Sequence, residues 1–274
     1  MDFVYICRAG DNEELRYSIR SVVHSFPEAR IWVVGGKPDW YTGHYIEVYQ
    51  TGSKYTNAIN NLNAACSSQN ISDTFVLMND DFFILKSVTS IKNFYSGSLQ
   101  DKIDKYIKIS GHTAYIRKLI STNNKLSSSG IDNPLDYELH VPMIMEKNKL
   151  HFILDKYPTY LWRSVYGNLY KVGGDIAEDV KIYSNNRYNG RSKSTTDDST
   201  FISTEDKSFN MIKDKIIKLF PNPSIYESPW QESNLRHQAQ KSCVLSTELQ
   251  RVGATSENRT HTLTLARLRT TTMQ

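Results

Sequence analysis

Residues 75–85 read FVLMNDDFFIL, and this stretch decides the fold. An amide and two carboxylates, Asn79, Asp80 and Asp81, interrupt an otherwise unbroken apolar run. Such a run is typical of a buried strand, where an unpaired carboxylate is costly and normally pairs, protonates or binds a metal. The sequence therefore predicts a strand over residues 74–78 that ends at Asn79, with the carboxylates directed into a cleft at the sheet edge.

The segments before this strand alternate between strand and helix patterns. Strand-forming residues at 3–7 precede a polar turn, and then Leu15, Ile19, Val22 and Phe26 recur at helical spacing until Pro27. Further strands are predicted at 30–36 and 45–49 and a further helix at 55–66. This alternation predicts an α/β fold with a mostly parallel sheet and helices on both faces. Ligands of such sheets bind beyond the carboxyl ends of the strands, where we expect Arg8, Gly35 and Asn79 to meet.

The alternation fades after residue 90. We expect residues 1–90 to form the α/β core and residues 91–227 a smaller α+β part of the same domain. Within that part the patterns predict the following elements: a helix over 143–156, an apolar segment at 160–170, a strand near 180–183, and a last helix marked by Phe209, Ile212, Ile216 and Leu219 and ended by Pro221.

Residues 228–274 differ in composition from the rest. Ser, Thr, Gln, Asn and Arg dominate, and large apolar side chains are sparse. Such a segment cannot offset its ordering entropy by burial. It resembles translation of a non-coding region, so we expect a disordered or non-native tail; a basic arm that contacts nucleic acid is the alternative.

Charge and cysteine content exclude several protein classes. The chain has 33 basic and 29 acidic side chains, but six of the basic and three of the acidic ones lie in residues 230–274, so the remainder is nearly neutral. Nucleic-acid binding by the core would therefore need a local patch of basic residues.

The three widely spaced cysteines form no CxxC pair, which argues against a zinc site or a disulfide framework. With no signal peptide and no long apolar run, we expect a cytoplasmic protein without a membrane partner.

The acidic motif is the first candidate site. Mg²⁺ and Mn²⁺ take oxygen ligands, commonly one or two from protein and the rest from substrate phosphates and water. Asp81, with or without Asp80, could hold such an ion, which would neutralise charge on a departing nucleoside diphosphate. The alternative is that the two aspartates merely form a turn or cap a helix.

The turn after the first strand is the second candidate. Arg8 and the free amides at the helix start could hold a phosphate or a nucleobase edge. Arg16 and Arg20 share a helix face. An exposed helix in which Glu13 pairs with Arg16 is the alternative.

The third candidate combines a histidine with an arginine. His140 precedes Val141-Pro142 and could act as a general base, although a lone histidine is more often structural. Arg163 lies in an apolar aromatic segment and would need a carboxylate or phosphate partner if buried. Otherwise it is a surface arginine.

Together these motifs resemble the Stealth family, whose members transfer hexose-1-phosphate from a nucleotide-sugar to a glycan. The resemblance rests on five segments that keep the family's order: Asp11-Asn12-Glu13-Glu14-Leu15-Arg16-Tyr17-Ser18-Ile19-Arg20-Ser21, Asn57-Ala58-Ile59-Asn60, Asn79-Asp80-Asp81-Phe82-Phe83, His140-Val141-Pro142, and Arg163. It covers roughly residues 3–165. The chain is also similar to small glycosyltransferases encoded by bacteriophages. Two departures from Stealth are the Ala9-Gly10 pair before Asp11 and the absence of the family's final acidic and helical regions.

The resemblance implies a GT-A-like, Rossmann-like core and a nucleotide-sugar donor, with a UDP-sugar favoured. It assigns donor binding to Arg8, Asn12, Arg16, Asn57 and Asn79. It places Mn²⁺ or Mg²⁺ on Asp81 and Asp80, and catalysis on His140, Arg163 and Asp80.

The transferred group and the acceptor stay open at this point. Glycosyl transfer and hexose-1-phosphate transfer are both compatible with the motifs, and the acceptor is a glycan, a modified DNA base or a small metabolite. A non-catalytic nucleotide- or DNA-binding module is an alternative of another class. A two-metal nuclease that uses Asp80 and Asp81 is a third, although the expected cluster of further acidic and lysine residues beside them is missing.

Overall fold

The computed structural model describes residues 1–184 and 199–228. The chain divides into two units, Met1–Glu227 and Ser228–Gln274. Apart from Ser228, the tail expected at 228–274 lies outside the described residues. All helices and strands given below belong to the first unit.

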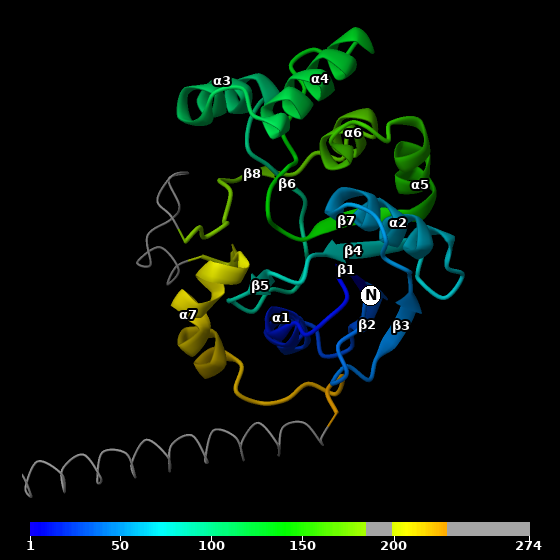
Figure 1. Cartoon of the computed structure of the whole chain (residues 1–274), viewed down its shortest axis with the longest axis vertical. Helices are drawn as coiled ribbons and strands as arrows, with labels where there is room; N and C mark the ends of the chain where they lie inside the picture. The colour runs from blue at the N-terminus through cyan, green and yellow to red at the C-terminus, as the bar shows by residue number, and fades with distance from the viewer. Residues whose placement is uncertain (185–198, 229–274) are drawn as a thin grey trace, which may run out of the picture. The chain divides into compact units, whose positions relative to one another are not determined.

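A five-stranded sheet forms the centre of the first unit (Figure 1). Its strands lie in the order β3 (His44–Glu47), β2 (Arg30–Gly35), β1 (Asp2–Cys7), β4 (Thr74–Met78) and β7 (Met143–Glu146). The first four run parallel, and β7 is antiparallel to β4. The predicted mixed α/β fold with a mostly parallel sheet is confirmed.

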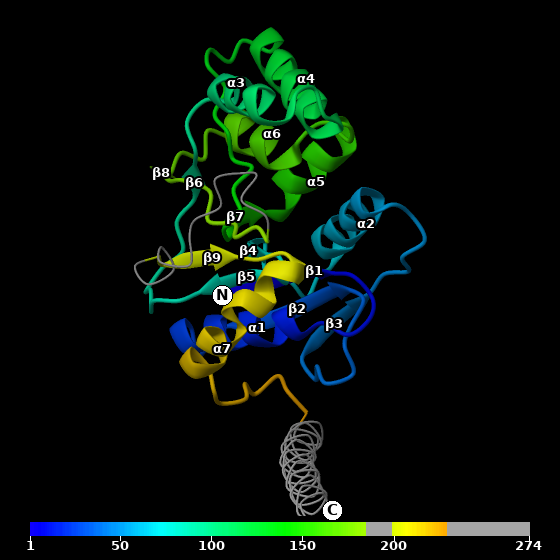
Figure 2. The ribbon, with the colours of Figure 1, turned by 60° about the vertical axis from the view of Figure 1, so that its left-hand side comes forward.

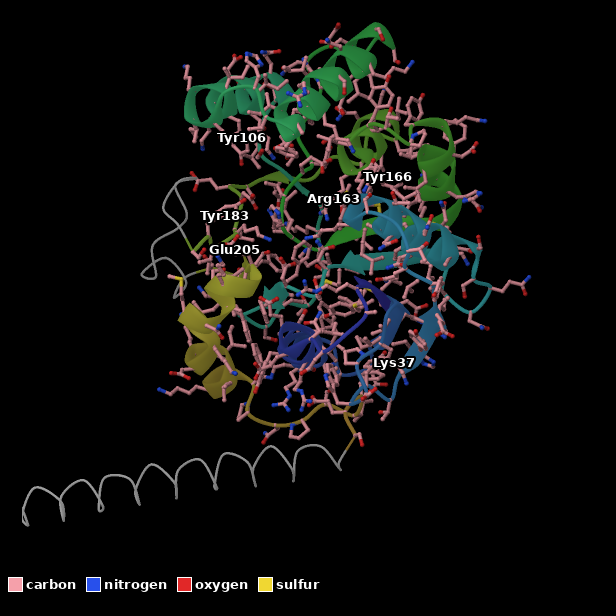
Figure 3. The ribbon with its side chains drawn as sticks, in the orientation of Figure 1. Lys37, Tyr106, Arg163, Tyr166, Tyr183 and Glu205 are labelled. Carbon is pink, nitrogen blue, oxygen red and sulfur yellow. The ribbon has the colours of Figure 1, made fainter. Side chains whose placement is uncertain are left out.

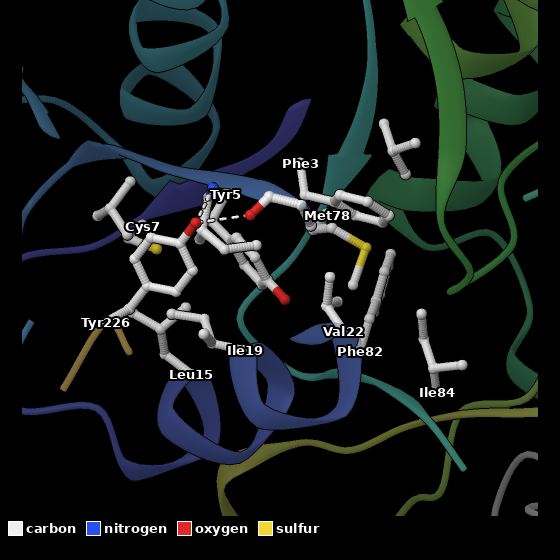
Figure 4. Packing of buried hydrophobic residues seen from close by; sticks show 14 of the residues in the cluster. Phe3, Tyr5, Cys7, Leu15, Ile19, Val22, Met78, Phe82, Ile84 and Tyr226 are labelled. Carbon is white, nitrogen blue, oxygen red and sulfur yellow. Dashed lines mark hydrogen bonds between the residues drawn. The ribbon is translucent and has the colours of Figure 1, made fainter. Parts of the chain in front are cut away.

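Helices cover both faces of this sheet because successive strand residues point to opposite sides. On one face Leu15, Ile19 and Val22 of α1 (Glu13–Ser25) pack against Phe3, Tyr5 and Met78 (Figure 4). On the other face Val4, Val34 and Leu77 join a second cluster with α2 (Lys54–Ser67), α5 (Lys147–Lys156) and α6 (Trp162–Leu169). The helix predicted before the second strand and the helix predicted after the third strand are therefore present on opposite faces.

The helix predicted over 143–156 is wrong in its first turn. Residues 143–146 form β7, and α5 begins only at Lys147. Met143 and Met145 are buried on the sheet while Glu146 is exposed, and Leu77 pairs with Met143 in the register. Edge pairing with β4 satisfies the backbone of these four residues, so tertiary context overrides the helical periodicity.

Residues 91–142 hold a helical hairpin that the sequence patterns did not predict. It consists of α3 (Leu99–Ser110) and α4 (Ala114–Ser128) and has its own small core, in which Leu99, Leu119 and Leu126 meet Leu161 before α6. Both views place the hairpin beside α6 (Figures 1 and 2). The hairpin forms one wall of the cavity described below.

The remaining elements lie outside the five-stranded sheet. Strand β5 (Phe82–Ile84) pairs with β9 (Phe201–Ser203), β6 (Phe94–Tyr95) pairs with β8 (Asp175–Ile176), and α7 (Asp206–Leu219) is the predicted last helix. Phe83, Ile202 and Phe209 share a third cluster. In place of the strand predicted near 180–183, an isolated bridge joins Lys181 to Ser203.

The end of the first unit is fastened to α1. Arg20 forms two hydrogen bonds with the Glu227 carboxylate, at 2.8 and 2.7 Å, and Arg16 lies 3.5 Å from the same group. All three residues are buried. The alternative of an exposed helix in which Glu13 pairs with Arg16 is therefore wrong, and Glu13 instead pairs with Lys213.

Among the described residues, no helix combines the length and the apolar character needed to cross a membrane.

Candidate functional site

Three hydrogen bonds to the carbonyl oxygen of Cys7 hold the loop after β1 in place. The Cys7 oxygen accepts hydrogen bonds from Gly36 N, from Gln50 Nε2 at 2.6 Å and from Asn61 Nδ2 at 3.1 Å. A Cβ at Gly36 would lie 2.2 Å from the Cα of Ala9, so only glycine permits this approach. The exposed Arg8 is consequently presented from a rigid backbone at the carboxyl edge of the sheet.

Asn12 joins this loop to the acidic motif. Its Oδ1 accepts from Leu15 N and caps α1, while its Nδ2 donates to Asp80 Oδ2 at 2.5 Å. One amide thus satisfies a helix start and orients a carboxylate 68 positions away. The structure brings together Arg8, Asn12 and the Asn79–Asp81 turn, as the topology of a parallel sheet led us to expect.

Asp80 lies in an environment that disfavours its charge. Burial and the neighbouring Asp81 raise the pKa of the Asp80 carboxyl, and Asn12, Arg8 and Lys54 oppose them only in part. A bound cation would relieve both unfavourable effects. The electrostatics at this point therefore suit a positively charged ligand.

Asp81 faces a different neighbour. Its Oδ2 accepts from Lys181 Nζ at 2.8 Å and from Ser203 Oγ at 3.2 Å, whereas its Oδ1 is buried without a hydrogen-bond partner. An orphaned carboxylate oxygen beside a second carboxylate has the chemistry of a hard-cation ligand. The donor set fits Mg²⁺ or Mn²⁺ with two protein ligands. Within residues 1–184 and 199–228 no three His, Cys, Asp or Glu side chains gather into a metal-binding group.

Two of the expected donor-binding residues have other contacts. The Arg16 guanidinium is buried, lies 4.7 Å from the centre of the Trp40 ring and approaches Glu227. The Asn57 amide closes the loop before α2 by exchanging hydrogen bonds with the backbone of Gly52 at 3.0 and 3.1 Å. These contacts are those of structural residues.

His140 is held by an aspartate that the sequence patterns did not single out. Its Nδ1 lies 2.8 Å from Asp179 Oδ2, and its backbone N–H donates to Asp179 Oδ1 at 3.0 Å. Burial raises the pKa of Asp179, but the hydrogen bonds and charge of His140 outweigh it and hold that pKa well below its usual range. A carboxylate accepts, so Nδ1 carries the hydrogen and Nε2 is left as an acceptor.

Arg163 is buried and belongs to a network of charges beneath the same region. Its Nε donates to the Tyr137 carbonyl and its Nη2 to the Val141 carbonyl at 2.7 Å, so the reading as a surface arginine is wrong. Burial lowers the pKa of Arg163, and the Glu138 carboxylate offsets this effect only in part. Burial likewise raises the pKa of Glu138, despite the neighbouring Arg163.

Lys102 completes the network from the hairpin. Its Nζ lies 2.8 Å from Asp136 Oδ2 and 3.0 Å from the Glu138 carbonyl oxygen. Burial lowers the pKa of Lys102, but Asp136 more than compensates, and the pKa is raised overall. The lysine therefore keeps its charge and ties α3 to the segment that leads to His140.

A cavity of about 640 Å³ lies beside His140 and the Arg163 network, and its size is within the range of small-ligand sites. Its polar lining includes Asn79, Lys102, Glu138, His140, Arg163 and Asp179. Its aromatic lining includes Phe82, Tyr106, Tyr115, Trp162 and Tyr183, and Figure 3 shows Tyr106, Arg163 and Tyr183 on three separate segments. The cavity is therefore lined both by Asn79, the first residue of the acidic motif, and by His140.

Sequence patterns missed Asp179, Lys181 and the hairpin residues. Asp179 and Lys181 flank an apolar residue in a segment that looked like an ordinary strand start, and Tyr106 and Tyr115 lay where no periodicity was recognised. A signal was nevertheless present for Asp179, because a catalytic histidine needs a partner for its second ring nitrogen.

No protein-family model matches this chain, and no curated protein matches it. Several solved structures are similar to it, and two of them are structures of one enzyme. The galactosyltransferase LgtC, crystallised with donor and acceptor sugar analogues, is 11% identical over 85% of this chain and 99% of that chain, with a TM-score of 0.46. An active-site mutant of LgtC is 11% identical over 84% and 99%, with a TM-score of 0.47. A likeness of this degree assigns no substrate, and the chemistry of the site rests on its side chains.

Proposed function

We propose that this protein is a GT-A-like transferase that takes a nucleotide-sugar, with a UDP-sugar as the favoured donor, and passes its sugar or sugar-1-phosphate to a hydroxyl acceptor. The proposal rests on one observation: Asn79, the first residue of the acidic motif, lines the same cavity as a histidine whose Nδ1 is held by Asp179. In this proposal the acidic motif would activate the donor, at the donor end of the site, and His140 would remove a proton, at its acceptor end.

The donor end is formed by Arg8, Asn12 and the Asn79–Asp81 turn. Arg8 contributes a positive charge for the diphosphate, and the Asn12 amide fixes Asp80 Oδ2. A Mg²⁺ or Mn²⁺ ion bound by Asp80 and Asp81 would supply charge neutralisation on the departing phosphate. The raised pKa of Asp80 and the orphaned oxygen of Asp81 support this assignment.

The acceptor end is formed by His140. With its Nδ1–H donated to Asp179, Nε2 can take the proton of an acceptor hydroxyl as that oxygen attacks. Asp179 then stabilises the imidazolium that forms. General-base help of this kind contributes roughly 10²–10⁴-fold to rate.

Hexose-1-phosphate transfer is the second candidate, and the buried Arg163 favours it. An arginine that lines the cavity with His140 suits a transferring phosphoryl group, which gathers charge on its equatorial oxygens. The two reactions break different donor bonds: glycosyl transfer releases a nucleoside diphosphate and sugar-phosphate transfer a nucleoside monophosphate. Incubation with a donor carrying labels in both the sugar and the β-phosphate, followed by product analysis, distinguishes them.

Donor binding is tested by a thermal-shift screen of nucleotide-sugars with and without Mn²⁺. We expect one donor class to raise the melting temperature of the wild type in Mn²⁺, and the shift to vanish in Asp81→Asn. The matched control is Asp155→Asn, which alters an exposed carboxylate on α5. Equal shifts in wild type and Asp81→Asn would favour a non-catalytic nucleotide-binding module, and cleavage of plasmid DNA with Mg²⁺ would favour a nuclease.

A further inference from the structure

Lys181 is built into the acidic motif. Its Nζ lies 2.8 Å from Asp81 Oδ2, and the side chains of the two residues are only 15% and 13% exposed. Ser203, which forms a backbone bridge with Lys181, donates its hydroxyl to the same carboxylate oxygen at 3.2 Å. The position of the ammonium group is therefore set by backbone pairing, and it differs from a surface lysine that reaches a carboxylate by chance.

A lysine in this position competes with a metal ion. Asp81 is one of only two carboxylates in the motif, and a divalent ion at its Oδ1 must share that carboxylate with the Lys181 ammonium group on Oδ2, which repels the ion. An ion such as Mg²⁺ takes about six oxygen ligands, mostly from water and phosphate. The described residues add no third acidic or histidine ligand nearby. The protein alone thus offers a poor cation site that already contains a positive charge.

The nucleoside diphosphate changes this balance. The oxygens of the diphosphate provide further ligands for the ion. The negative charge of the diphosphate gives the Lys181 ammonium group a second anionic partner besides the Asp81 carboxylate. We infer that Lys181 is an internal cation that keeps the Asp80–Asp81 pair closed to a divalent ion until the diphosphate arrives, so that ion and diphosphate bind cooperatively. This inference rests on the proposed function. Because coupling is reciprocal, each ligand strengthens the binding of the other by the same factor.

The test measures Mn²⁺ binding directly, by the loss of the free-ion electron paramagnetic resonance signal, with Mn²⁺ alone and with Mn²⁺ plus UDP. In the wild type we expect UDP to tighten Mn²⁺ binding by on the order of tenfold or more. In Lys181→Gln we expect Mn²⁺ alone to bind roughly tenfold more tightly than in the wild type, with a smaller effect of UDP. Lys181→Arg keeps the charge and should behave as the wild type does.

The matched control is Lys92→Gln, which removes a lysine from an exposed pair with Asp175 and should change nothing. Melting curves confirm that each variant is folded at the assay temperature. Equal Mn²⁺ affinity in wild type and Lys181→Gln, with UDP tightening both alike, overturns the role of Lys181 and leaves the donor site standing. Absence of Mn²⁺ binding in all variants, even with UDP, overturns the cation site of the proposed function and this inference with it.

Discussion

Asp179 accepts hydrogen bonds from both the ring and the backbone of His140, at 2.8 and 3.0 Å. We expect Asp179→Asn to disturb the tautomer of the ring, because an amide can donate to Nδ1 and so favour a hydrogen on Nε2. Nitrogen-15 NMR of the histidine ring reads the tautomer without any substrate. Where an active donor and acceptor are available, the rate should fall roughly 10²–10⁴-fold. Glu178→Gln is the neighbouring control, and an unchanged ring spectrum in Asp179→Asn would contradict the role of Asp179.

The same pair predicts a pH dependence of stability. The folded-state pKa of Asp179 is held below its usual value, so its contribution is fully present above the unfolded pKa of about 3.9 and is lost as the pH falls through the folded value. Urea unfolding at pH 6 and pH 3 should show a smaller loss of unfolding free energy in Asp179→Asn than in the wild type. Equal losses in the two proteins would refute this contribution.

Substitution of Asp80 should raise the stability of the fold and weaken donor binding. Its pKa is raised in the fold, so the ionised carboxyl destabilises the folded protein at neutral pH, and Asp80→Asn removes that charge. We expect Asp80→Asn to melt a few degrees higher than the wild type at pH 7 while losing the Mn²⁺-dependent donor shift. A melting temperature below that of the wild type would show that the charged carboxylate is needed for folding, contrary to this prediction.

Substitutions at Asn12 and Asn57 should have different effects on donor affinity, although the sequence predicts that both residues bind the donor. Asn12→Gly keeps a tolerated N-cap, costing only a few tenths of a kcal/mol, but removes the amide that fixes Asp80. Donor affinity should fall about tenfold, as is typical for a lost hydrogen bond to a charged group. Asn57→Ala opens the loop at Gly52 and should leave donor affinity unchanged in isothermal titration. A larger affinity loss in Asn57→Ala than in Asn12→Gly would reverse the assignment.

Glu227 should be among the most sensitive positions for stability. Glu227→Gln leaves Arg16 and Arg20 buried without a counter-charge, and breaking such a group costs about 3–5 kcal/mol. The control Glu13→Gln breaks an exposed pair with Lys213 and should cost about 1 kcal/mol or less. Urea denaturation measures both. Similar losses of unfolding free energy in the two variants would show that the ion pairs of Glu227 do not stabilise the fold in this way.

The sheet and its carboxyl edge were predictable because parallel strands and amphipathic helices leave strong local patterns. Leu15, Ile19 and Val22 define the buried face of α1 whatever they pack against, and the apolar run before Asn79 can hardly be anything but a central strand. Parallel topology then brings Arg8 and Asp80 to one edge without any knowledge of the contacts between them.

The partners of the site residues were not predictable in the same way. Asp179 lies 39 positions from His140, and Lys181 lies 100 positions from Asp81, so both contacts depend on how the second half of the unit folds over the sheet. Residues 143–146 show the same limit, because pairing with β4 decided their conformation. Local periodicity contains no information about such long-range choices.

The ion pairs of Glu227 with Arg16 and Arg20 also constrain the order of folding events during synthesis of the chain. Arg20 is synthesised 207 positions before the Glu227 carboxylate that neutralises it. Until Glu227 emerges from the ribosome, the guanidinium groups of Arg16 and Arg20 on α1 lack this carboxylate. The nascent chain therefore cannot complete its core as it emerges, even though most of the parallel strands appear early. A stop codon shortly before residue 227 would release a polypeptide that has nearly every helix and strand and lacks the last charge needed to lock them.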